Sequence, residues 1–264
     1  MLRVSGLFIY PIKSLGGISV STAEVTDRGL RFDRRWMLVD SDNVFISQRT
    51  VPSMALIRVS LGTEALEVRS RLHPDVLRVP YRPLGARFGE VRVWDDTCRG
   101  QFVSVEADHW FSAALGITCR LVYMPEETMR ITDPNYAPEG GITSFADAFP
   151  FLLIGEASLD DLNRRLDGPV PMDRFRPNIV FTGGEPFFED SLKEFYIRDI
   201  RFRGVKLCAR CPIPTIDQET AERGKEPLRT LARYRFRDNK VYFGQNLIHQ
   251  GLGEIAVGDP ILVS

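Results

Sequence analysis

The chain has 264 residues, of which 34 are Lys or Arg and 35 are Asp or Glu, so its formal charge is −1. This balance disfavours a nucleic-acid-binding protein, because binding a duplex needs a basic surplus to displace counterions from the phosphates. A hydrophobic share of 44% and a charged share of 26% are typical of a globular protein with one large or two small domains. We find no membrane segment and no signal peptide in the sequence and expect a cytoplasmic protein.

Short runs rich in Val, Ile, Leu and aromatic residues dominate the first third of the chain. Each run is bounded by Gly, Pro, Asp or Asn, a pattern that predicts the strands of a barrel or a sandwich. One helix is expected over residues 108–115, with Asp108 as its N-cap and Gly116 just past its end, and a strand follows at 119–123. The strands predicted before this helix are 7–12, 19–25, 36–39, 54–61, 65–69, 76–79 and 90–94.

Residues 124–146 have little hydrophobic periodicity and include three prolines and two glycines. A loop of this length is uncommon in a compact domain unless it is functional or a linker. We therefore expect a linker or a mobile cover loop that gates a site. The segment also suggests a boundary between one domain at 1–123 and a second domain at 124–264.

The second half opens with an apolar strand at 151–154. A helix is expected from Ser158, which can cap it, with Asp161 completing a capping box. Further strands are predicted at 178–181 and within 194–211, and residues 253–263 are expected to form a closing β-hairpin. Together these patterns predict an α+β protein that is predominantly β and has two subdomains.

The sequence around Cys208 and Cys211 leaves several interpretations open. Period-2 alternation along an extended strand would point the two thiols to opposite faces. A zinc knuckle would need a tight turn and four ligands, a thioredoxin-type dithiol would need a following helix rather than Pro212 and Pro214, and the two cysteines could simply pack. A single Cys211 thiolate could instead bind a soft or high-valent metal that a cofactor already chelates, and Arg210 beside it would lower the thiol pKa.

Seven short motifs occur along the chain in a recognisable order. They are YPIKS at 10–14, DRRW at 33–36, FRPN at 175–178, CARC at 208–211, KEPL at 225–228, FGQN at 243–246 and VGDP at 257–260. In this order the chain resembles the MOSC-domain proteins over essentially its whole length, and in particular the branch of the amidoxime-reducing components. The resemblance implies a MOSC N-terminal β-barrel domain followed by a MOSC β-barrel domain with a few helices.

The resemblance also implies a molybdenum cofactor, Mo-molybdopterin, and a set of residues that bind it. Cys211 matches the cysteine that ligates molybdenum, and Asp147 and Asp217 are candidates for relaying protons, although Asp217 could instead start a turn. Ala148 and Phe149 lie where animal relatives carry small hydroxyl residues, so here they offer only backbone N–H groups. The positions expected to bind the pterin and its phosphate are Lys13, Ser14, Arg34, Ala148, Phe149, Arg176, Asn178, Arg210 and Asn246. Arginine side chains suit this role because their planar guanidinium groups bind phosphate bidentately.

The activity implied by the resemblance is reduction of N-hydroxylated compounds such as amidoximes, hydroxylamines and N-hydroxylated bases. The alternatives are a sulfur carrier, because MOSC domains also occur in molybdenum-cofactor sulfurases, and a carrier of the cofactor itself. The sequence has no C-x₄-C-x₂-C run for an iron–sulfur cluster. We therefore expect electrons from a separate flavin, haem or iron–sulfur reductase.

Overall fold

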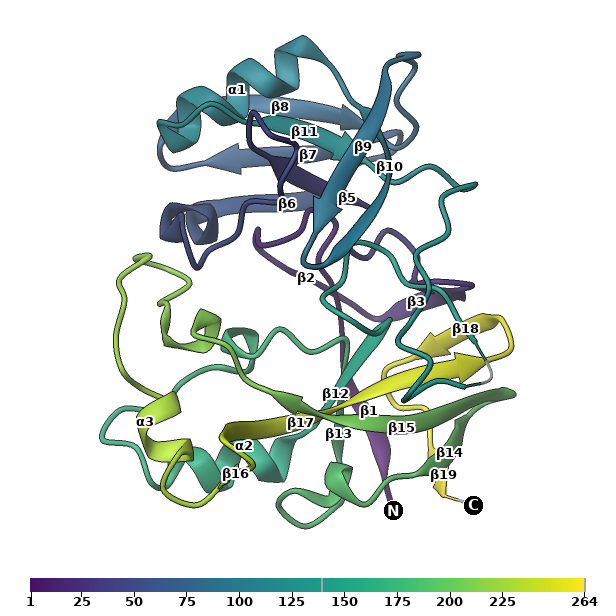
Figure 1. Cartoon of the computed structure of the whole chain (residues 1–264). Helices are drawn as coiled ribbons and strands as arrows, with labels where there is room; N and C mark the ends of the chain where they lie inside the picture. Colours follow the sequence, from purple (N-terminus) through teal and green to yellow (C-terminus); the bar gives the residue numbers. More distant parts are fainter. Residues whose placement is uncertain (139, 264) are drawn as a thin grey trace.

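The computed structural model describes residues 1–138 and 140–263, which form two lobes stacked one above the other (Figure 1). The described chain is mostly strand with a few short helices, which confirms the predicted α+β, predominantly β class. Residues 36–123 make the upper lobe. Its elements are β5 (Trp36–Val39), the 3₁₀ helix η1 (Pro52–Leu56), β6 (Ile57–Leu61), β7 (Ala65–Ser70), β8 (His73–Pro80), β9 (Phe88–Val93), β10 (Asp96–Phe102), α1 (Val105–Leu115) and β11 (Arg120–Tyr123).

The lower lobe combines residues 1–30 with residues 147–263. Its first strands are β1 (Arg3–Ile9), β2 (Ile18–Val20), β3 (Thr22–Thr26) and β4 (Gly29–Leu30). The later elements are β12 (Phe151–Gly155), α2 (Glu156–Asn163), η2 (Met172–Arg174), β13 (Ile179–Thr182), η3 (Phe188–Asp190), β14 (Glu194–Ile197), β15 (Ile200–Ala209), η4 (Ile213–Thr215), α3 (Leu228–Leu231), β16 (Phe236–Arg237), β17 (Lys240–Gln250), β18 (Gly253–Ala256) and β19 (Ile261–Val263).

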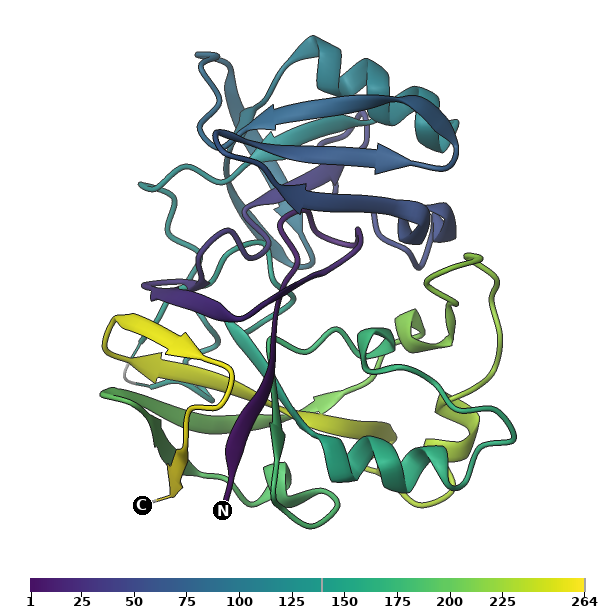
Figure 2. The ribbon, with the colours of Figure 1, turned by 180° about the vertical axis from the view of Figure 1, so that it is seen from behind.

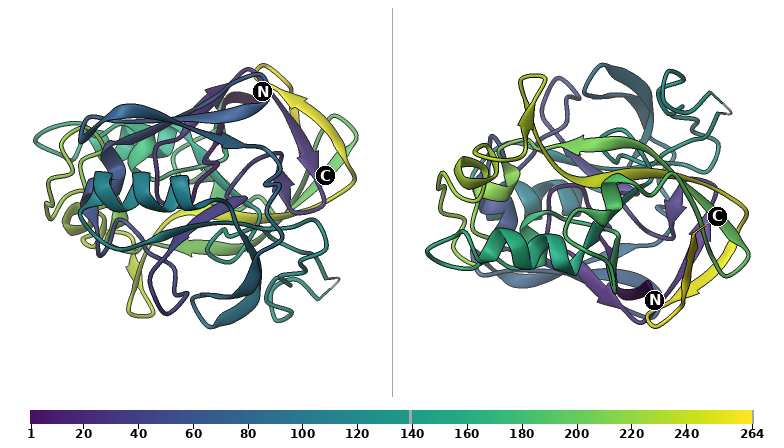
Figure 3. Two further views of the ribbon diagram at one scale, coloured as in Figure 1. Left: turned by 90° about the horizontal axis from the view of Figure 1, so that it is seen from above. Right: turned by 90° about the horizontal axis from the view of Figure 1, so that it is seen from below.

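Two small antiparallel sheets and one helix enclose the core of the upper lobe. The strand orders are β5-β11-β10-β9 and β6-β7-β8. Helix α1 lies across the top of this lobe (Figure 3) and buries Trp110 and Phe111 against it. The helix starts three residues earlier than predicted, because Ser104 caps it by accepting the Ala107 N–H at 3.1 Å. Asp108 is not the cap; its carboxylate accepts the Leu121 N–H at 2.8 Å and ties the helix to β11.

One large sheet forms the lower lobe, in the order β19-β14-β15-β17-β12-β13-β1-β2, with β16 paired to β17. Its first strand, β1, rises from the N-terminus through the lobe (Figure 2) and pairs with β13. Phe151, Phe195 and Phe202 pack together in the core beneath the sheet. The opening of the chain is therefore built into a sheet that the second half completes.

Two local predictions for the second half are wrong. Helix α2 starts at Glu156, and Ser158 is buried inside it, where its hydroxyl donates to Glu189 at 2.8 Å and accepts the Phe187 N–H at 2.7 Å. The hydroxyl is therefore used for tertiary contacts and not for a cap. The last two strands do not form a hairpin with each other, because β18 pairs with β3 and β19 pairs with β14.

The segment at 124–146 is tied to the rest of the molecule along the part that the structure describes. The Thr143 N–H bonds to the Arg130 carbonyl at 2.9 Å, and the Phe145 N–H bonds to the Arg34 carbonyl at 3.0 Å. Arg130 is buried, with its Nε 2.7 Å from Asp96 and its Nη2 donating to the Asp147 carbonyl at 2.9 Å. The role of the segment at 124–146 as a linker or cover stays a prediction.

Within the described residues, no helix combines the length and apolar content that crossing a bilayer requires.

Candidate functional site

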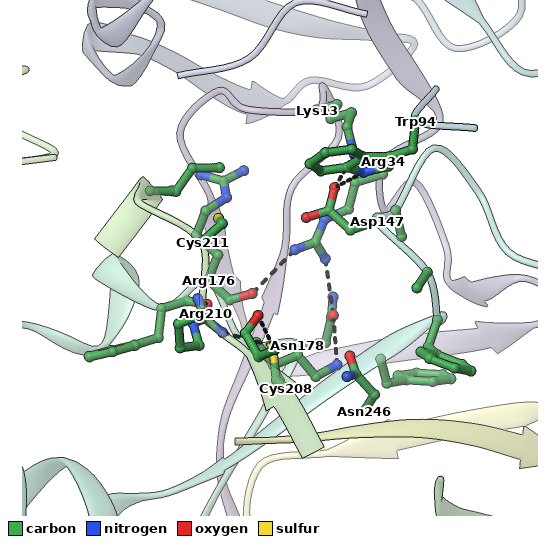
Figure 4. Close-up of a pocket in the computed structure, with 18 of the residues that line it drawn as sticks. Lys13, Arg34, Trp94, Asp147, Arg176, Asn178, Cys208, Arg210, Cys211 and Asn246 are labelled. Carbon is green, nitrogen blue, oxygen red and sulfur yellow. Dashed lines mark hydrogen bonds and ion pairs between the residues drawn. The ribbon is translucent and has the colours of Figure 1, made fainter. Parts of the chain in front are cut away.

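A cavity of about 460 Å³ lies between the two lobes, at the end of β15 (Figure 4). Residues from seven separate parts of the chain line it, so no local segment could form it alone. All but one of the site residues predicted from the sequence lie on its wall. They are Lys13, Ser14, Arg34, Asp147, Ala148, Phe149, Arg176, Asn178, Arg210, Cys211 and Asn246.

Both cysteines of the CARC motif line this cavity, and the extended strand that would point their thiols to opposite faces does not reach Cys211. The alternation does not apply because β15 ends at Ala209, with an irregularity in its pairing to β17 between Leu207 and Ala209. Beyond that point Pro212 leads the chain into η4. Neither cysteine is in a disulfide.

Within residues 1–138 and 140–263, no cluster of three or more His, Cys, Asp or Glu side chains could hold a metal ion. Cys211 is the predicted ligand on the cavity wall. A metal bound to its thiolate would need its other ligands from a chelating cofactor, the kind of centre that suits a soft sulfur donor.

The Arg210 guanidinium is bonded to the Cys208 sulfur. The sequence had suggested the Cys211 thiol as its neighbour instead. The Nη1 of Arg210 donates to the Cys208 sulfur at 3.2 Å, and its Nη2 donates to the Phe175 carbonyl at 2.9 Å (Figure 4). Burial raises the pKa of the Cys208 thiol, and the nearby Arg210 cation only partly opposes this effect. The Nε of Arg210 is buried and has no hydrogen-bond partner.

Arg176 is a buried cation with an uncommitted nitrogen. The side chain is 8% exposed, and its Nη1 donates to the Leu15 carbonyl at 2.7 Å while its guanidinium lies 4.2 Å from the centre of the Tyr10 ring. Burial lowers the pKa of Arg176 to about 10. Among the residues that the structure describes, its buried Nη2 has no hydrogen-bond partner. Unpartnered buried donors are rare and costly, so those on Arg176 and Arg210 fit a site for an anionic ligand such as a phosphate.

Arg34, in contrast, is paired with a carboxylate and bonded to further protein groups. Its Nη1 lies 2.7 Å from Asp33 and donates to the Asn178 side-chain oxygen at 3.0 Å, and its Nη2 donates to the Arg176 carbonyl at 3.2 Å. Asn178 in turn donates to the Phe8 carbonyl at 3.2 Å. These bonds link the DRRW motif, which contains Arg34, and strand β1 to the FRPN motif. They explain why the DRRW and FRPN motifs meet at one cavity.

Lys13 and Asp147 form an ion pair at 2.5 Å, and the same carboxylate oxygen accepts the Trp94 indole N–H at 3.1 Å. Lys13 also donates to the Phe145 carbonyl at 2.7 Å. Burial lowers the pKa of Lys13 to about 8, although Asp147 opposes this shift. The Asp147 carboxylate lies inside the cavity but is open to its solvent; burial alone would raise its pKa, but Lys13 and Trp94 hold that pKa below its usual range.

Of four further predicted residues, three line the cavity and one does not. Asn246 lines the cavity from β17 and donates to the Lys206 carbonyl at 3.1 Å. Ala148 and Phe149 also line it. Asp217 lies outside the cavity wall: its carboxylate accepts the Glu219 N–H at 2.9 Å and lies 2.9 Å from Arg174. The geometry of Asp217 is that of a turn, which was the alternative that the sequence left open.

A buried pair of glutamines connects the loop after Cys211 to the upper lobe. Gln48 donates to the Gln218 side chain at 3.1 Å and Gln218 donates back at 3.0 Å. Gln48 also donates to the Ser14 carbonyl at 2.8 Å. Beside them, Arg58 forms an ion pair with Glu219. We call Gln48 and Gln218 the glutamine clasp; it links the Ser14 side of the cavity to the segment that carries Cys211.

Several cavity residues were missed from the sequence. Trp94 and Asp95 come from the turn between β9 and β10 in the upper lobe, and Cys208 and Ile213 flank the predicted ligand. The signal for the first two was present, since a Trp followed by two aspartates at a strand end is an unusual turn. The sequence did not indicate that this turn reaches the lower lobe.

The chain is similar to known proteins over nearly its full length. Residues 1–118 match the MOSC N-terminal beta barrel domain, and residues 141–262 match the MOSC domain. The mitochondrial amidoxime-reducing component 1 of Mus musculus is 35% identical, over 98% of this chain and 81% of that protein. Component 2 of Rattus norvegicus is 36% identical, over 98% of this chain and 82% of that protein. The molybdenum cofactor sulfurase of Oryza sativa subsp. japonica is 31% identical over 96% of this chain, but only 33% of its own length is covered.

Proposed function

Because the chain belongs to the MOSC-domain family, in the branch of the amidoxime-reducing components, we propose that it is a molybdenum-cofactor-dependent reductase of N-hydroxylated compounds. The observation that carries the proposal is the shared wall of the cavity, which a free cysteine and two arginines line together, each arginine keeping a buried nitrogen without a partner among the described residues. A thiolate ligand and anion-binding donors are the two features that a phosphate-bearing dithiolene cofactor requires of a protein.

In this proposal Cys211 binds the metal, and Arg176 and Arg210 receive the anionic part of the cofactor on their uncommitted nitrogens. Ser14 and Asn178 contribute polar contacts, and Asn246 borders the pterin from β17. Ala148 and Phe149 contribute backbone N–H groups. When bound, the cofactor supplies two-electron redox chemistry at the metal, and the protein supplies binding, orientation and electrostatics.

Lys13 and Asp147 have different roles in proton transfer. The Asp147 carboxylate stays ionised because its pKa is held low, so it is a poor proton donor near neutral pH. The ammonium of Lys13, with a pKa of about 8, can hold a proton at neutral pH and release it readily. We assign Lys13 the role of proton donor at this end of the cavity and Asp147 the role of keeping Lys13 charged. Asp217 has no part in this assignment, because it lies off the cavity wall.

The test is to produce the protein in a cofactor-competent host, measure molybdenum and pterin content, and assay benzamidoxime reduction with reduced benzyl viologen as the electron donor. The Cys211→Ser variant is expected to keep its fold, change the metal's spectroscopic signature and lose at least about 10³-fold in rate, because the serine hydroxyl is a poor substitute for a thiolate ligand. Cys98→Ala is the matched control, since Cys98 is buried in the upper lobe away from the cavity. Unchanged turnover in Cys211→Ser would contradict the proposal.

A carrier is the second candidate, and the similarity to a cofactor sulfurase favours it. A cofactor carrier would bind the pterin at the same residues and show no turnover with the viologen donor. A sulfur carrier would show a persulfide on a cavity cysteine by intact-protein mass spectrometry. The reductase proposal also requires a separate donor protein, which fractionation against natural reductases with flavin, haem or iron–sulfur centres would identify.

A further inference from the structure

Trp94 is held in a strained position on the wall of the cavity. It sits between β9 and β10 with φ 57°, a left-handed conformation that a bulky residue rarely adopts. Such strain is maintained only when the surroundings enforce it, and it concentrates at sites that bind ligands. The side chain also stays 40% exposed while it lines the cavity. A large aromatic surface is therefore kept open at a place where burying it would be favourable.

Three neighbours fix the orientation of the indole. Its N–H donates to Asp147 at 3.1 Å, the Arg49 guanidinium lies 3.9 Å from its ring centre, and the Phe45 ring lies 5.1 Å away at a tilt. Arg49 covers one face of the indole, while the side chain lines the cavity and stays 40% exposed. The ring is thus preorganised, which lowers the entropic cost of binding a flat ligand.

Asp147 contributes a second recognition group beside this ring. The hydrogen bonds from Lys13 and Trp94 both go to its Oδ1 atom. Within the described residues, the Oδ2 atom of Asp147 accepts no hydrogen bond, and the side chain is 58% exposed. Figure 4 shows the carboxylate next to the indole and apart from the Cys211 thiol. An acceptor next to an aromatic face suits a planar ligand that carries an N–H group close to its ring.

We propose that Trp94 is a specificity-determining residue that stacks on the aromatic ring of the substrate, while Asp147 accepts an N–H from the carbon-bound amino group. The favoured substrates are then planar amidine-like N-hydroxylated compounds, namely aryl amidoximes and N-hydroxylated amino-bases, with the N–OH group directed towards Cys211. This inference rests on the proposed reductase function. The tests distinguish a failure of this inference from a failure of the reductase function, because they compare substrates that share the same N–OH group.

The main experiment uses cofactor-loaded protein, reduced benzyl viologen and two substrates, benzamidoxime and acetamidoxime, which differ only in the ring. Stacking on an aromatic side chain is worth about 1–3 kcal/mol, so Trp94→Leu should raise KM for benzamidoxime roughly 10–100-fold. For acetamidoxime the kcat/KM should stay within about twofold. Trp94→Phe keeps an aromatic face and should restore most of the affinity for benzamidoxime. The matched control is Phe236→Leu, an exposed aromatic residue of β16 that does not line the cavity.

An equal loss for both substrates would make Trp94 a purely structural contact between the lobes and would overturn the inference, as would an unchanged KM for benzamidoxime. Benzaldoxime, which keeps the ring and the N–OH but lacks the amino group, tests Asp147. We expect it to bind roughly tenfold more weakly than benzamidoxime, the loss typical of a charge-assisted hydrogen bond. Equal affinity for the two would remove Asp147 from the recognition.

Fluorescence gives a readout that does not need turnover. Of the three tryptophans, Trp36 and Trp110 are buried, so the exposed indole is that of Trp94. Titration of loaded protein with benzamidoxime should quench fluorescence with saturation in the wild type and not in Trp94→Phe. If neither benzamidoxime nor acetamidoxime is reduced but benzamidoxime still quenches the Trp94 fluorescence, the proposed reductase function fails and the binding inference stands. Absent quenching in a protein that reduces both amidoximes overturns the inference alone.

Discussion

The positive charges around the cavity fall into two groups that look alike in sequence and differ in structure. On one side, Lys13 and Arg34 are neutralised by carboxylates of the protein itself, Asp147 and Asp33. On the other side, Arg176 and Arg210 donate to carbonyl oxygens and a sulfur, and within the described residues each retains a buried nitrogen without a hydrogen-bond partner. In our proposal the first group builds the wall of the cavity, and the second group receives the ligand.

This difference shows that burial of a cation does not by itself indicate a binding site. A buried charge must be paired, and the question is whether the pair is completed within the chain or by something that binds to it. Counting the partners of each nitrogen separates the two cases.

The largest expected effect is loss of stability on removing Arg34. Arg34→Gln leaves the Asp33 carboxylate buried without its cation, and breaking one partner of a buried pair costs about 3–5 kcal/mol. Urea unfolding of the cofactor-free protein measures this change. The double variant Arg34→Gln/Asp33→Asn should recover a large part of the loss. A stability unchanged in Arg34→Gln would mean that this cation is not structural.

Arg176→Gln should affect the cofactor more than the fold. It removes one hydrogen bond to the Leu15 carbonyl together with the unpartnered Nη2 and leaves no buried carboxylate without its cation, so the free energy of unfolding should change less than in Arg34→Gln. Cofactor retention should fall about 10–100-fold, the equivalent of one or two charge-assisted hydrogen bonds. Pterin content after extended dialysis measures it, with Arg71→Gln, an exposed arginine of the upper lobe, as the control. Equal cofactor loss in Arg34→Gln and Arg176→Gln would show that the two groups of cations do not differ in cofactor binding.

The glutamine clasp extends the comparison to neutral groups that are completed within the chain. Gln48→Leu or Gln218→Leu alone leaves the other amide buried and unsatisfied, which should cost about 1–3 kcal/mol. The double variant replaces both amides and should lie within about 1 kcal/mol of wild type. In cofactor-free protein, alkylation of Cys211 should be faster in the single variants, because the loop that follows it is released. Additive losses in the double variant would show that the two amides are not coupled.

The smallest effect concerns protonation on the Lys13 side. The pKa of Lys13 is lowered to about 8 mainly by burial, and Asp147 raises it, so Asp147→Asn should lower the pKa of Lys13 further. Competitive labelling with acetic anhydride between pH 6 and 10, read by mass spectrometry, gives the midpoint. The peptide that contains Lys225 serves as the reference for reagent concentration. A midpoint that rises in Asp147→Asn would reverse the sign of this argument.

Local features of the fold could be predicted from the sequence where a local pattern determines them. The strand at 36–39 matches β5, and the end of α1 at Gly116 follows from a glycine with φ 67°. Predictions failed where a competing partner lay far away in sequence. Ser158 was expected to cap α2 but is used by Glu189, and the last two strands pair with β3 and β14 rather than with each other.

The candidate site was predictable only through the order of its motifs. Nothing within YPIKS or FRPN indicates that they meet, since their contact, such as that of Arg176 with the Tyr10 ring, joins residues more than 160 positions apart. Cys208 and Trp94 were missed for a related reason. Where a strand ends, side-chain alternation stops, and the direction of the next residues is set by tertiary contacts that the sequence does not display.

The pairing of β1 with β13 has a consequence for how the polypeptide is made. About 170 residues separate the two strands, so at roughly 5–20 residues per second β1 leaves the ribosome roughly 10–30 s before its partner is synthesised. During that interval the edge of β1 that later pairs with β13 is open, although β2 can already pair with its other edge, while the upper lobe can fold from contiguous sequence. The nascent chain would therefore carry a finished upper lobe with a loose leading strand, a natural substrate for a ribosome-associated chaperone.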